Sequence, residues 1–241
     1  MNKITGLAIP YFYIDSYNSS QPAIVLNEDT SKHIVQVLRM KKGEKLNLTD
    51  GKGNLLIVEI EDDHKKHCLV KVIDTRFVPG DSRKISIGIS LIKNTSRFEW
   101  FLEKAAEIGI HEIIPLVCER TEKQKFRADR MKSILVSAML QSQQSRLPVL
   151  REPVSIKKVI EESGHHQKFI AHCMEEKKAD LSDLVNDSLH SQIILVGPEG
   201  DFTKDEIDTA VQHHFIAVTL GETRLRTETA GIVAATILKL S

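Results

Sequence analysis

The chain has 241 residues, of which 41% are hydrophobic and 27% are charged, a content that suits one large or two small globular domains with an ample core. Its 33 basic and 33 acidic residues cancel, so a nucleic-acid partner would have to be bound by a local basic patch and not by the overall field. Three scattered cysteines without a CxxC exclude a disulfide framework, and the absence of a signal peptide or a bilayer-length apolar run predicts a cytoplasmic protein with no membrane partner.

The first part of the chain, residues 1–78, is predicted to be β-rich because short alternating runs are separated by turn residues. The predicted strands cover residues 23–26, 45–48, 55–60 and 68–73. One helix is expected at residues 33–40, with Thr30 or Ser31 as its cap. The glycine-containing segment 50–54 leads into a strand, which favours a hairpin turn over a phosphate-binding loop.

A polar segment around Pro79 and Gly80 marks the best domain boundary, so we divide the chain into residues 1–78 and 79–241. The second part alternates strands and helices, which is typical of the α/β class. Its predicted strands are 85–92, 112–117, 169–171, 192–196 and 215–220, and its predicted helices are 98–108, 128–144, 181–189 and 230–238. Gly109 is expected to end the first of these helices.

A local basic patch precedes the second of these helices. Its cations are Arg120, Lys123, Lys125, Arg127, Arg130 and Lys132, against only Glu122 and Asp129. Such a patch could supply affinity for a polyanion, because neutralised phosphates release counterions. The same charges could equally form an ordinary solvated face.

The densest signal lies in residues 192–236. A buried strand ends in Gly197-Pro198-Glu199-Gly200, and a second strand ends at Gly221. Open α/β sheets bind ligands outside the carboxyl ends of such strands, although the first loop could also simply reverse the chain. Neither a GK[ST] nor a GxGxxG motif is present, which excludes the usual nucleoside-triphosphate and dinucleotide sites. Thr203 and Glu206 form a capping box that predicts a helix after the first loop.

A cluster of possible metal ligands surrounds the strand at residues 169–171. Its members are His165, His166, His172, Cys173, Glu175 and Glu176. The spacing fits no zinc pattern, so we expect no metal. His172 is instead expected at the carboxyl end of the strand, beside the binding site.

The combination of motifs in the C-terminal stretch resembles the signature of the SPOUT methyltransferases, and specifically the RsmE family, which methylates N3 of a uridine in 16S ribosomal RNA. The matching residues are Gly197-Pro198-Glu199-Gly200, Phe202, Glu206-Ile207, Leu220-Gly221 and Leu225-Arg226-Thr227-Glu228-Thr229-Ala230. The resemblance implies an α/β fold in which a C-terminal SPOUT trefoil-knot domain with a parallel sheet follows an N-terminal PUA-like β-barrel domain. It also implies S-adenosylmethionine as cofactor and a homodimer packed through the knot.

The resemblance extends to the RNA-binding parts of the chain. His33-Ile34, Val37-Leu38-Arg39 and Asp50-Gly51 resemble the PUA-like domain that docks on RNA, and Lys93, Arg97, Glu99, Lys104, Glu107 and Gly109 match a later family segment. Arg39, Lys93, Arg97 and Arg120 are therefore candidate RNA contacts. Without the family, Arg39 with Lys41 and Lys42 would read as a solvated helix end, and Lys93 and Arg97 as an exposed first turn.

The resemblance also supplies the candidate site residues. The implied cofactor contacts are His172, Gly197, Pro198, Glu199, Gly200, Leu220, Gly221, Leu225, Arg226 and Thr227. Loss of the uridine N3 proton leaves negative charge, so Arg226 is the candidate to stabilise the developing anion. Glu228 could accept the proton, orient Arg226 or only cap the final helix. That helix, residues 230–238, is so apolar that it either fills the core or forms the dimer interface.

Two residues depart from the family pattern, namely Gln144, where an Arg is expected, and Asp201, where Gly is more usual. The predicted function is methylation of N3 of a specific uridine in the 16S rRNA of the small subunit, with S-adenosylmethionine as donor. Two alternatives stay open: a knotted RNA methyltransferase with another target nucleotide, and a non-catalytic RNA-binding factor in ribosome assembly.

Overall fold

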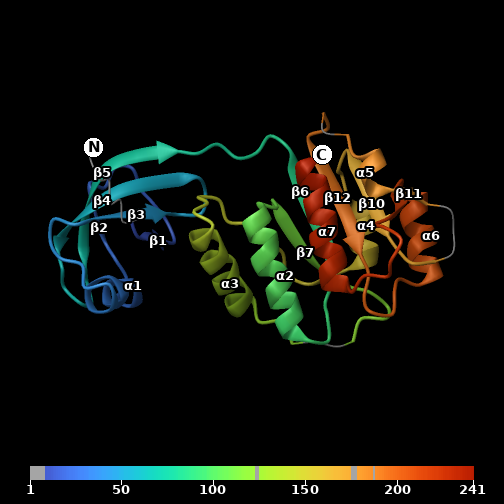
Figure 1. Cartoon of the computed structure of the whole chain (residues 1–241), viewed down its shortest axis with the longest axis horizontal. Helices are drawn as coiled ribbons and strands as arrows, with labels where there is room; N and C mark the ends of the chain where they lie inside the picture. Colours follow the sequence, from blue (N-terminus) through green and yellow to red (C-terminus); the bar gives the residue numbers. More distant parts are fainter. Residues whose placement is uncertain (1–8, 123–124, 175–177, 187) are drawn as a thin grey trace, which may run out of the picture. The chain divides into compact units, whose positions relative to one another are not determined.

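The computed structural model describes residues 9–122, 125–174, 178–186 and 188–241, and these residues form two compact units (Figure 1). The first unit takes the chain up to Gly80 together with Met139–Leu147, and the second takes Asp81–Ala138 and Pro148–Ser241. A short segment far along the chain therefore returns to the N-terminal unit.

The first unit is built on one five-stranded sheet in the order β1-β3-β4-β5-β2. Only the β1–β3 pair is parallel. The elements are β1 (Tyr11–Tyr13), β2 (Ala23–Val25), α1 (Glu28–Lys32), a π-helical turn (His33–Val37), β3 (Lys45–Thr49), β4 (Asn54–Asp62) and β5 (Leu69–Phe77). Alternate residues of β3 and β4, such as Leu46 and Val58, are fully buried, so period-two patterning produces the core of a partial barrel.

The helical segment of the first unit begins earlier than the sequence predicts. Asn27, and not Thr30 or Ser31, is the cap, since its side chain accepts the Thr30 N–H at 2.8 Å. Ser31 is buried because its hydroxyl donates to the Leu26 carbonyl and accepts from the Cys68 N–H. The turn ends before Arg39, which has a left-handed backbone with φ 57°.

The segment Met139–Leu147 docks on the turn between β3 and β4. The Leu147 N–H donates to the Gly51 carbonyl and the Gly53 N–H donates to the Ser145 carbonyl, each at 2.8 Å. The predicted hairpin at residues 50–54 is confirmed by the antiparallel β3–β4 pairing, and the turn also anchors a distant segment. The helix before that segment, α3 (Ala128–Gln141), ends earlier than predicted because Gln143 adopts φ 56°.

The second unit contains a parallel sheet in the order β11-β13-β10-β12-β6-β7-β8, with β9 also paired to β7. The elements before α3 are β6 (Lys84–Ser90), α2 (Thr95–Ile108) and β7 (Glu112–Val117). Those after it are β8 (Val149–Leu150), β9 (Val154–Ser155), α4 (Ile156–Glu162), β10 (Gln167–Ala171), β11 (Ala179–Asp180), α5 (Leu181–Leu184), β12 (Ser191–Val196), α6 (Lys204–Gln212), β13 (Ile216–Thr219) and α7 (Thr227–Leu240). The five predicted strands are confirmed with small changes at their ends. The helix predicted at 181–189 is shorter, because Val185 already has an extended backbone.

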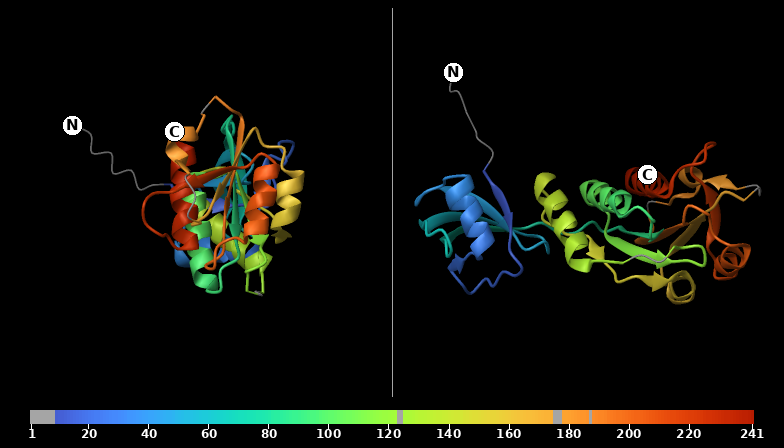
Figure 2. Two further views of the ribbon diagram at one scale, coloured as in Figure 1. Left: turned by 90° about the vertical axis from the view of Figure 1, so that its right-hand side faces the viewer. Right: turned by 90° about the horizontal axis from the view of Figure 1, so that it is seen from below.

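Helices cover both faces of this sheet. Figure 2 shows α2 and α7 on one face and α4 and α6 on the other. Gly109 ends α2 as predicted, with φ 83°, and the capping box of Thr203 and Glu206 opens α6. The final helix presents Gly231, Ala234 and Ala235 to the sheet and to α2, because only small residues allow so close an approach.

The close approach of α7 predicts that Gly231→Ala destabilises the second unit. A Cβ at Gly231 would stand 2.7 Å from the Phe101 ring and 2.8 Å from Cδ1 of Ile89, and both neighbours are fully buried. Alanine gains about 1 kcal/mol of helix propensity, but a Cβ below 3.0 Å from two fully buried side chains falls in the upper part of the overpacking range, about 2–3 kcal/mol, so we expect a net loss of about 1–2 kcal/mol. Denaturant unfolding followed by fluorescence of Trp100, the only tryptophan, reports on α2 directly.

Gly164→Ala is the matched control for this substitution, since a Cβ there meets no atom within 4 Å. It should change the free energy of unfolding by less than about 0.5 kcal/mol. Equal stability of the two variants would contradict tight packing at Gly231.

The three cysteines have different surroundings. Burial raises the pKa of the Cys68 thiol to about 11 and that of the Cys118 thiol to about 12, so both stay protonated. Cys173 is exposed. Among the helices that the structure describes, none has the length and apolar character needed to cross a membrane.

Candidate functional site

A pocket of about 730 Å³ lies at the carboxyl ends of three neighbouring strands of the second unit, β10, β12 and β13. The start of α7 and Arg97 of α2 complete its wall. The lining residues are Arg97, Ala171, His172, Cys173, Lys178, Val196, Gly197, Pro198, Glu199, Asp201, Val218, Thr219, Leu220, Gly221, Glu222, Thr223, Arg224, Leu225, Arg226, Thr227 and Ala230. The strand order therefore creates the crevice that the two glycine loops predict.

The loop after β12 is held from both sides. The Thr227 hydroxyl donates to the Gly197 carbonyl at 3.0 Å, which ties the start of α7 to this loop. A Cβ at Gly197 would lie 3.2 Å from the buried Phe202 ring, so glycine allows the loop to pack on that ring. Arg120 donates to the Gly200 carbonyl at 2.7 Å and fixes the far side of the loop.

The loop after β13 depends on a glycine for its conformation. Gly221 has φ 121°, a backbone region that L side chains rarely adopt. The Thr219 hydroxyl donates to the Gly221 carbonyl at 2.9 Å and closes the turn. Arg226 has an extended backbone and is the cap position of α7, which begins at Thr227.

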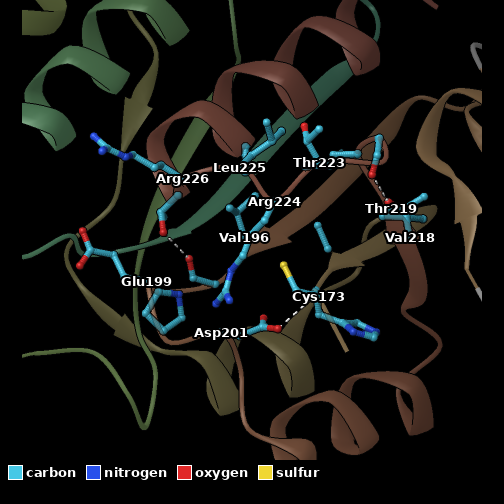
Figure 3. Close-up of a pocket in the computed structure, with 18 of the residues that line it drawn as sticks. Cys173, Val196, Glu199, Asp201, Val218, Thr219, Thr223, Arg224, Leu225 and Arg226 are labelled. Atoms are coloured by element: carbon cyan, nitrogen blue, oxygen red, sulfur yellow. Dashed lines mark hydrogen bonds between the residues drawn. The ribbon is translucent and has the colours of Figure 1, made fainter. Parts of the chain in front are cut away.

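The loop after β10 is anchored by a lysine and by an aspartate. The Lys178 ammonium donates to the carbonyls of His172 and Met174, each at 2.7 Å. The Asp201 carboxylate accepts the Cys173 N–H at 2.8 Å, and Figure 3 shows this bond within the pocket. His172 is buried at the strand end, as the sequence predicts.

Arg97 is placed between two carboxylates at the edge of the pocket. Its Nε lies 3.6 Å from Oε1 of Glu228, and its Nη1 donates to Oε1 of Glu199 at 3.4 Å. Glu228 is only 7% exposed, whereas the Glu199 side chain is 51% exposed. Oε2 of Glu228 is buried and accepts no hydrogen bond from any residue that the structure describes.

Two further cations line the pocket, Arg224 and Arg226. Neither guanidinium has a hydrogen-bond or ion-pair partner within the described ranges. In Figure 3 the Arg224 side chain runs toward Asp201, whereas the Arg226 side chain runs outward on the side where Glu199 lies. Both side chains are exposed and make no hydrogen bond or ion pair with a residue that the structure describes, which leaves them available to a ligand.

The structure brings most of the predicted cofactor residues together in this pocket. His172, Gly197, Pro198, Glu199, Leu220, Gly221, Leu225, Arg226 and Thr227 all belong to its lining. Gly200 does not, because it packs on the side chain of Arg120. Glu228 also lies outside the lining, and its contact is with Arg97 and not with Arg226.

Sequence reasoning missed several lining residues, among them Arg224, Cys173 and Lys178. Their common property is a position just after β10 or β13, at the same edge of the sheet as the glycine loops. The rule that ligands bind at the carboxyl ends of parallel strands would have identified these residues, but the order of the strands in the sheet could not be predicted from the sequence.

The predicted RNA contacts are distributed over both units. Arg39, in the first unit, is exposed at the end of the π-helical turn. In the second unit, Lys93 pairs with Glu122 at 3.1 Å and Arg97 lies at the pocket edge. Arg120, by contrast, is engaged with the loop after β12.

The basic patch at residues 120–132 is partly neutralised. Arg130 forms a two-pronged pair with Glu99 of α2, at 3.1 and 2.9 Å. Lys125 and Arg127 are exposed, and Lys123 lies outside the described residues.

The two departures from the expected pattern have different structural settings. The Gln144 amide donates to the Ser142 hydroxyl at 3.2 Å in the segment that docks on the first unit. Asp201 lines the pocket with φ 64°, a left-handed backbone in which glycine is the least strained residue.

The histidine-rich region near β10 does not gather into a metal site in the described part of the chain. No three or more His, Cys, Asp or Glu side chains come together there in a way that would hold an ion. Glu175 and Glu176, two of the candidate ligands, lie outside the described residues.

Comparison with known proteins agrees with this geometry. Residues 80–239 match the RNA methyltransferase domain family, and residues 26–73 match the RNA methyltransferase PUA domain. The fold is similar to that of a probable rRNA-methyltransferase from Porphyromonas gingivalis, with a TM-score of 0.89, 36% identity, and coverage of 96% of this chain and 99% of that one.

Two further relatives carry a more specific name. Ribosomal RNA small subunit methyltransferase E from Neisseria gonorrhoeae, solved bound to S-adenosyl methionine, has a TM-score of 0.86 at 25% identity, covering 96% of this chain and 97% of that one. Ribosomal RNA small subunit methyltransferase E from Rickettsia conorii is 26% identical over 233 residues, which are 95% of this chain and 94% of its own.

These matches confirm the predicted fold class, with a PUA-like N-terminal unit and an α/β methyltransferase unit of the SPOUT type. The family match covers well over half of the chain, including every lining residue of the pocket. The chain therefore belongs to the RNA methyltransferases, in the family of ribosomal RNA small subunit methyltransferase E.

Proposed function

We propose that this protein transfers a methyl group from S-adenosylmethionine to N3 of a specific uridine in the 16S rRNA of the small ribosomal subunit. The pocket at the ends of β10, β12 and β13 is the observation that carries the proposal, together with its two arginines that pair with no residue the structure describes. Membership of the methyltransferase E family and the S-adenosyl methionine bound by the Neisseria gonorrhoeae relative support it.

The pocket suits a bent nucleoside cofactor. Its volume of about 730 Å³ falls in the usual range for sites of this kind. Val218, Leu220 and Leu225 offer an apolar surface for the adenine, and the loops at Gly197 and Gly221 offer backbone groups for hydrogen bonds. When bound, S-adenosylmethionine supplies a methyl group already activated by its sulfonium.

The protein's own task is then to hold the acceptor base and to favour loss of its N3 proton. N3 belongs to the Watson–Crick edge, so the target uridine must be unpaired or flipped out to reach the pocket. Loss of the proton leaves negative charge shared between N3 and the flanking carbonyl oxygens. Arg226 is our candidate to stabilise this charge, because its guanidinium is exposed at the side of the pocket and has no partner in the described part of the chain.

Glu228 acts, in this proposal, through Arg97. The buried carboxylate lies 3.6 Å from Arg97 and outside the pocket lining, which favours a positioning role over direct proton transfer. Glu199 is the exposed partner of Arg97, so an RNA phosphate can replace it without disturbing the buried Glu228.

The two parts of the chain divide the work, with residues 1–78 docking on RNA and residues 79–241 carrying the chemistry. Arg39 and Lys93 are candidate phosphate contacts because both are exposed. Arg120 is a weaker candidate than the sequence suggests, since its guanidinium already holds the loop after β12.

The protein is proposed to act in the cytoplasm as a homodimer whose C-terminal unit contains the trefoil knot of its family. The side of α7 turned away from the sheet carries Ile232, Val233 and Ile237, which are only partly buried, and Leu240 is 80% exposed. Apolar residues in these positions suit a second copy of the chain. Sedimentation velocity at micromolar concentration measures the mass directly, and a monomer would contradict the dimer.

The decisive experiment is transfer of labelled methyl from S-adenosylmethionine to small ribosomal subunits purified from cells that lack this protein. The expected product, after digestion of the RNA, is 3-methyluridine at a single position. Naked 16S rRNA serves as the comparison substrate, and large subunits serve as the negative control.

Other products separate the parts of the proposal. A different methylated nucleoside would support the proposed cofactor but contradict the proposed target base, and the protein would then be a methyltransferase that acts on another nucleotide. Cofactor binding without any transfer would favour the non-catalytic RNA-binding factor.

A further inference from the structure

We propose that Asp201 is a positioning residue that preforms the cofactor pocket by fastening the loop after β10 to the loop after β12. The inference rests on the proposed function of this pocket as the S-adenosylmethionine site. It concerns a residue that the family signature does not include, at a position where the chain departs from the expected glycine.

The carboxylate of Asp201 uses both of its oxygens for backbone donors. Oδ1 accepts the Phe202 N–H at 2.9 Å, and Oδ2 accepts the Cys173 N–H at 2.8 Å. The second bond spans 28 residues of sequence and joins two different strand-end loops, as Figure 3 shows. Hydrogen bonds to an ionised acceptor are stronger than neutral ones, so this link is suited to fix the two loops together.

The backbone of Asp201 is held in an unusual conformation to make this link. Its φ is 64°, in the left-handed region, and its own N–H donates to the Pro198 carbonyl at 2.9 Å. Asp and Asn tolerate this region better than other side chains, although not as well as glycine. A strained residue at the wall of a binding pocket is an indication of function, because the surrounding structure must maintain it.

The two loops that Asp201 joins both line the pocket. They follow the adjacent parallel strands β10 and β12, whose last residues Ala171 and Val196 pair in register. Lys178 holds the loop after β10 from its other end, through the carbonyls of His172 and Met174. These anchors hold residues 172–174 in place before the cofactor binds, and a preorganised site binds more tightly.

Three variants separate the hydrogen bonds from the backbone strain. Asp201→Gly suits the left-handed backbone but removes both bonds, Asp201→Asn tolerates the backbone and retains one acceptor, and Asp201→Ala retains the strain without the bonds. Affinities for S-adenosylmethionine and for its product S-adenosylhomocysteine are measured by calorimetry. Asp208→Ala, on the exposed side of α6, is the matched control for loss of a carboxylate.

We expect Asp201→Gly to lower the affinity for both ligands equally, by about tenfold. The affinity of Asp201→Asn should lie between that of Asp201→Gly and that of the original protein. Asp201→Ala is expected to bind both ligands at least as weakly as Asp201→Gly. The amide proton of Cys173 should also exchange faster with solvent in Asp201→Gly, which NMR detects in the protein without ligand.

Two results would overturn the proposal. Unchanged affinity in Asp201→Gly would mean that the link does not organise the pocket. A loss confined to S-adenosylmethionine, with the product that lacks the sulfonium charge unaffected, would mean that the carboxylate acts by its charge on the cofactor and not by position. Failure of the original protein to bind S-adenosylmethionine would instead contradict the proposed function, while the exchange rate of the Cys173 amide would still test the link.

Discussion

Replacing Arg226 by alanine is expected to lower the turnover number about 10²–10³-fold, the usual effect of removing one group that stabilises developing negative charge. The affinity for S-adenosylmethionine and the free energy of unfolding should change little. The physical reason is that the Arg226 guanidinium is exposed and, among the described residues, makes no hydrogen bond or ion pair. Its backbone, and not its side chain, forms the cap position of α7, so truncation leaves the helix intact.

The measurement is single-turnover methyl transfer at saturating cofactor, with calorimetry for the cofactor affinity. Arg224→Ala is the control, because Arg224 is a second arginine of the same pocket without a partner among the described residues, but its side chain runs toward Asp201. We expect it to retain most of the turnover. If Arg226→Ala lost turnover and cofactor affinity equally, Arg226 would be a cofactor-binding residue and not one that stabilises the developing charge. If both variants lost turnover equally, the effect would come from the general positive charge of the pocket and not from Arg226 in particular.

The parallel sheet of the second unit could be predicted from the sequence because its strands are short apolar runs bounded by clear signals. Gly109 and the box of Thr203 and Glu206 mark helix ends by local chemistry alone, and both predictions are confirmed. The start of the helix near residue 33 was harder to predict, since Asn27, Thr30 and Ser31 are all residue types that cap helices well. In the structure the Ser31 hydroxyl is instead buried, where it bonds to the Leu26 carbonyl and to the N–H of Cys68, 37 residues away.

Long-range contacts explain what the sequence could not predict about the site. The glycine loops and the residues at the strand ends follow from local pattern and from the rule on parallel strands. The link between Asp201 and Cys173 spans 28 residues, and the pair of Arg97 and Glu228 joins α2 to α7. No local spacing encodes either contact, so the partner of Glu228 could not be predicted and Arg226 was the nearer candidate.

Replacing Glu228 by glutamine is expected to lower turnover about 10- to 100-fold, because Arg97 loses the buried one of the two carboxylates that hold it at the pocket edge and keeps only the exposed Glu199. The change in the free energy of unfolding should stay within about 1 kcal/mol. Glutamine keeps the volume of the side chain, and it removes a buried carboxylate of which one oxygen has no hydrogen-bond partner within the described residues. The loss of favourable charge at the start of α7 opposes that gain.

A double-mutant cycle distinguishes the positioning role from that of a general base. If Glu228 acts through Arg97, then Arg97→Ala already removes its effect, and Arg97→Ala with Glu228→Gln should be no slower than Arg97→Ala alone. A base would act independently of Arg97, so the double variant would lose at least another tenfold, and the acidic limb of the pH–rate profile would disappear with Glu228→Gln. Retention of that limb in Glu228→Gln, together with non-additive losses, would leave Arg97 as the group that meets the RNA and Glu228 as the residue that aims it.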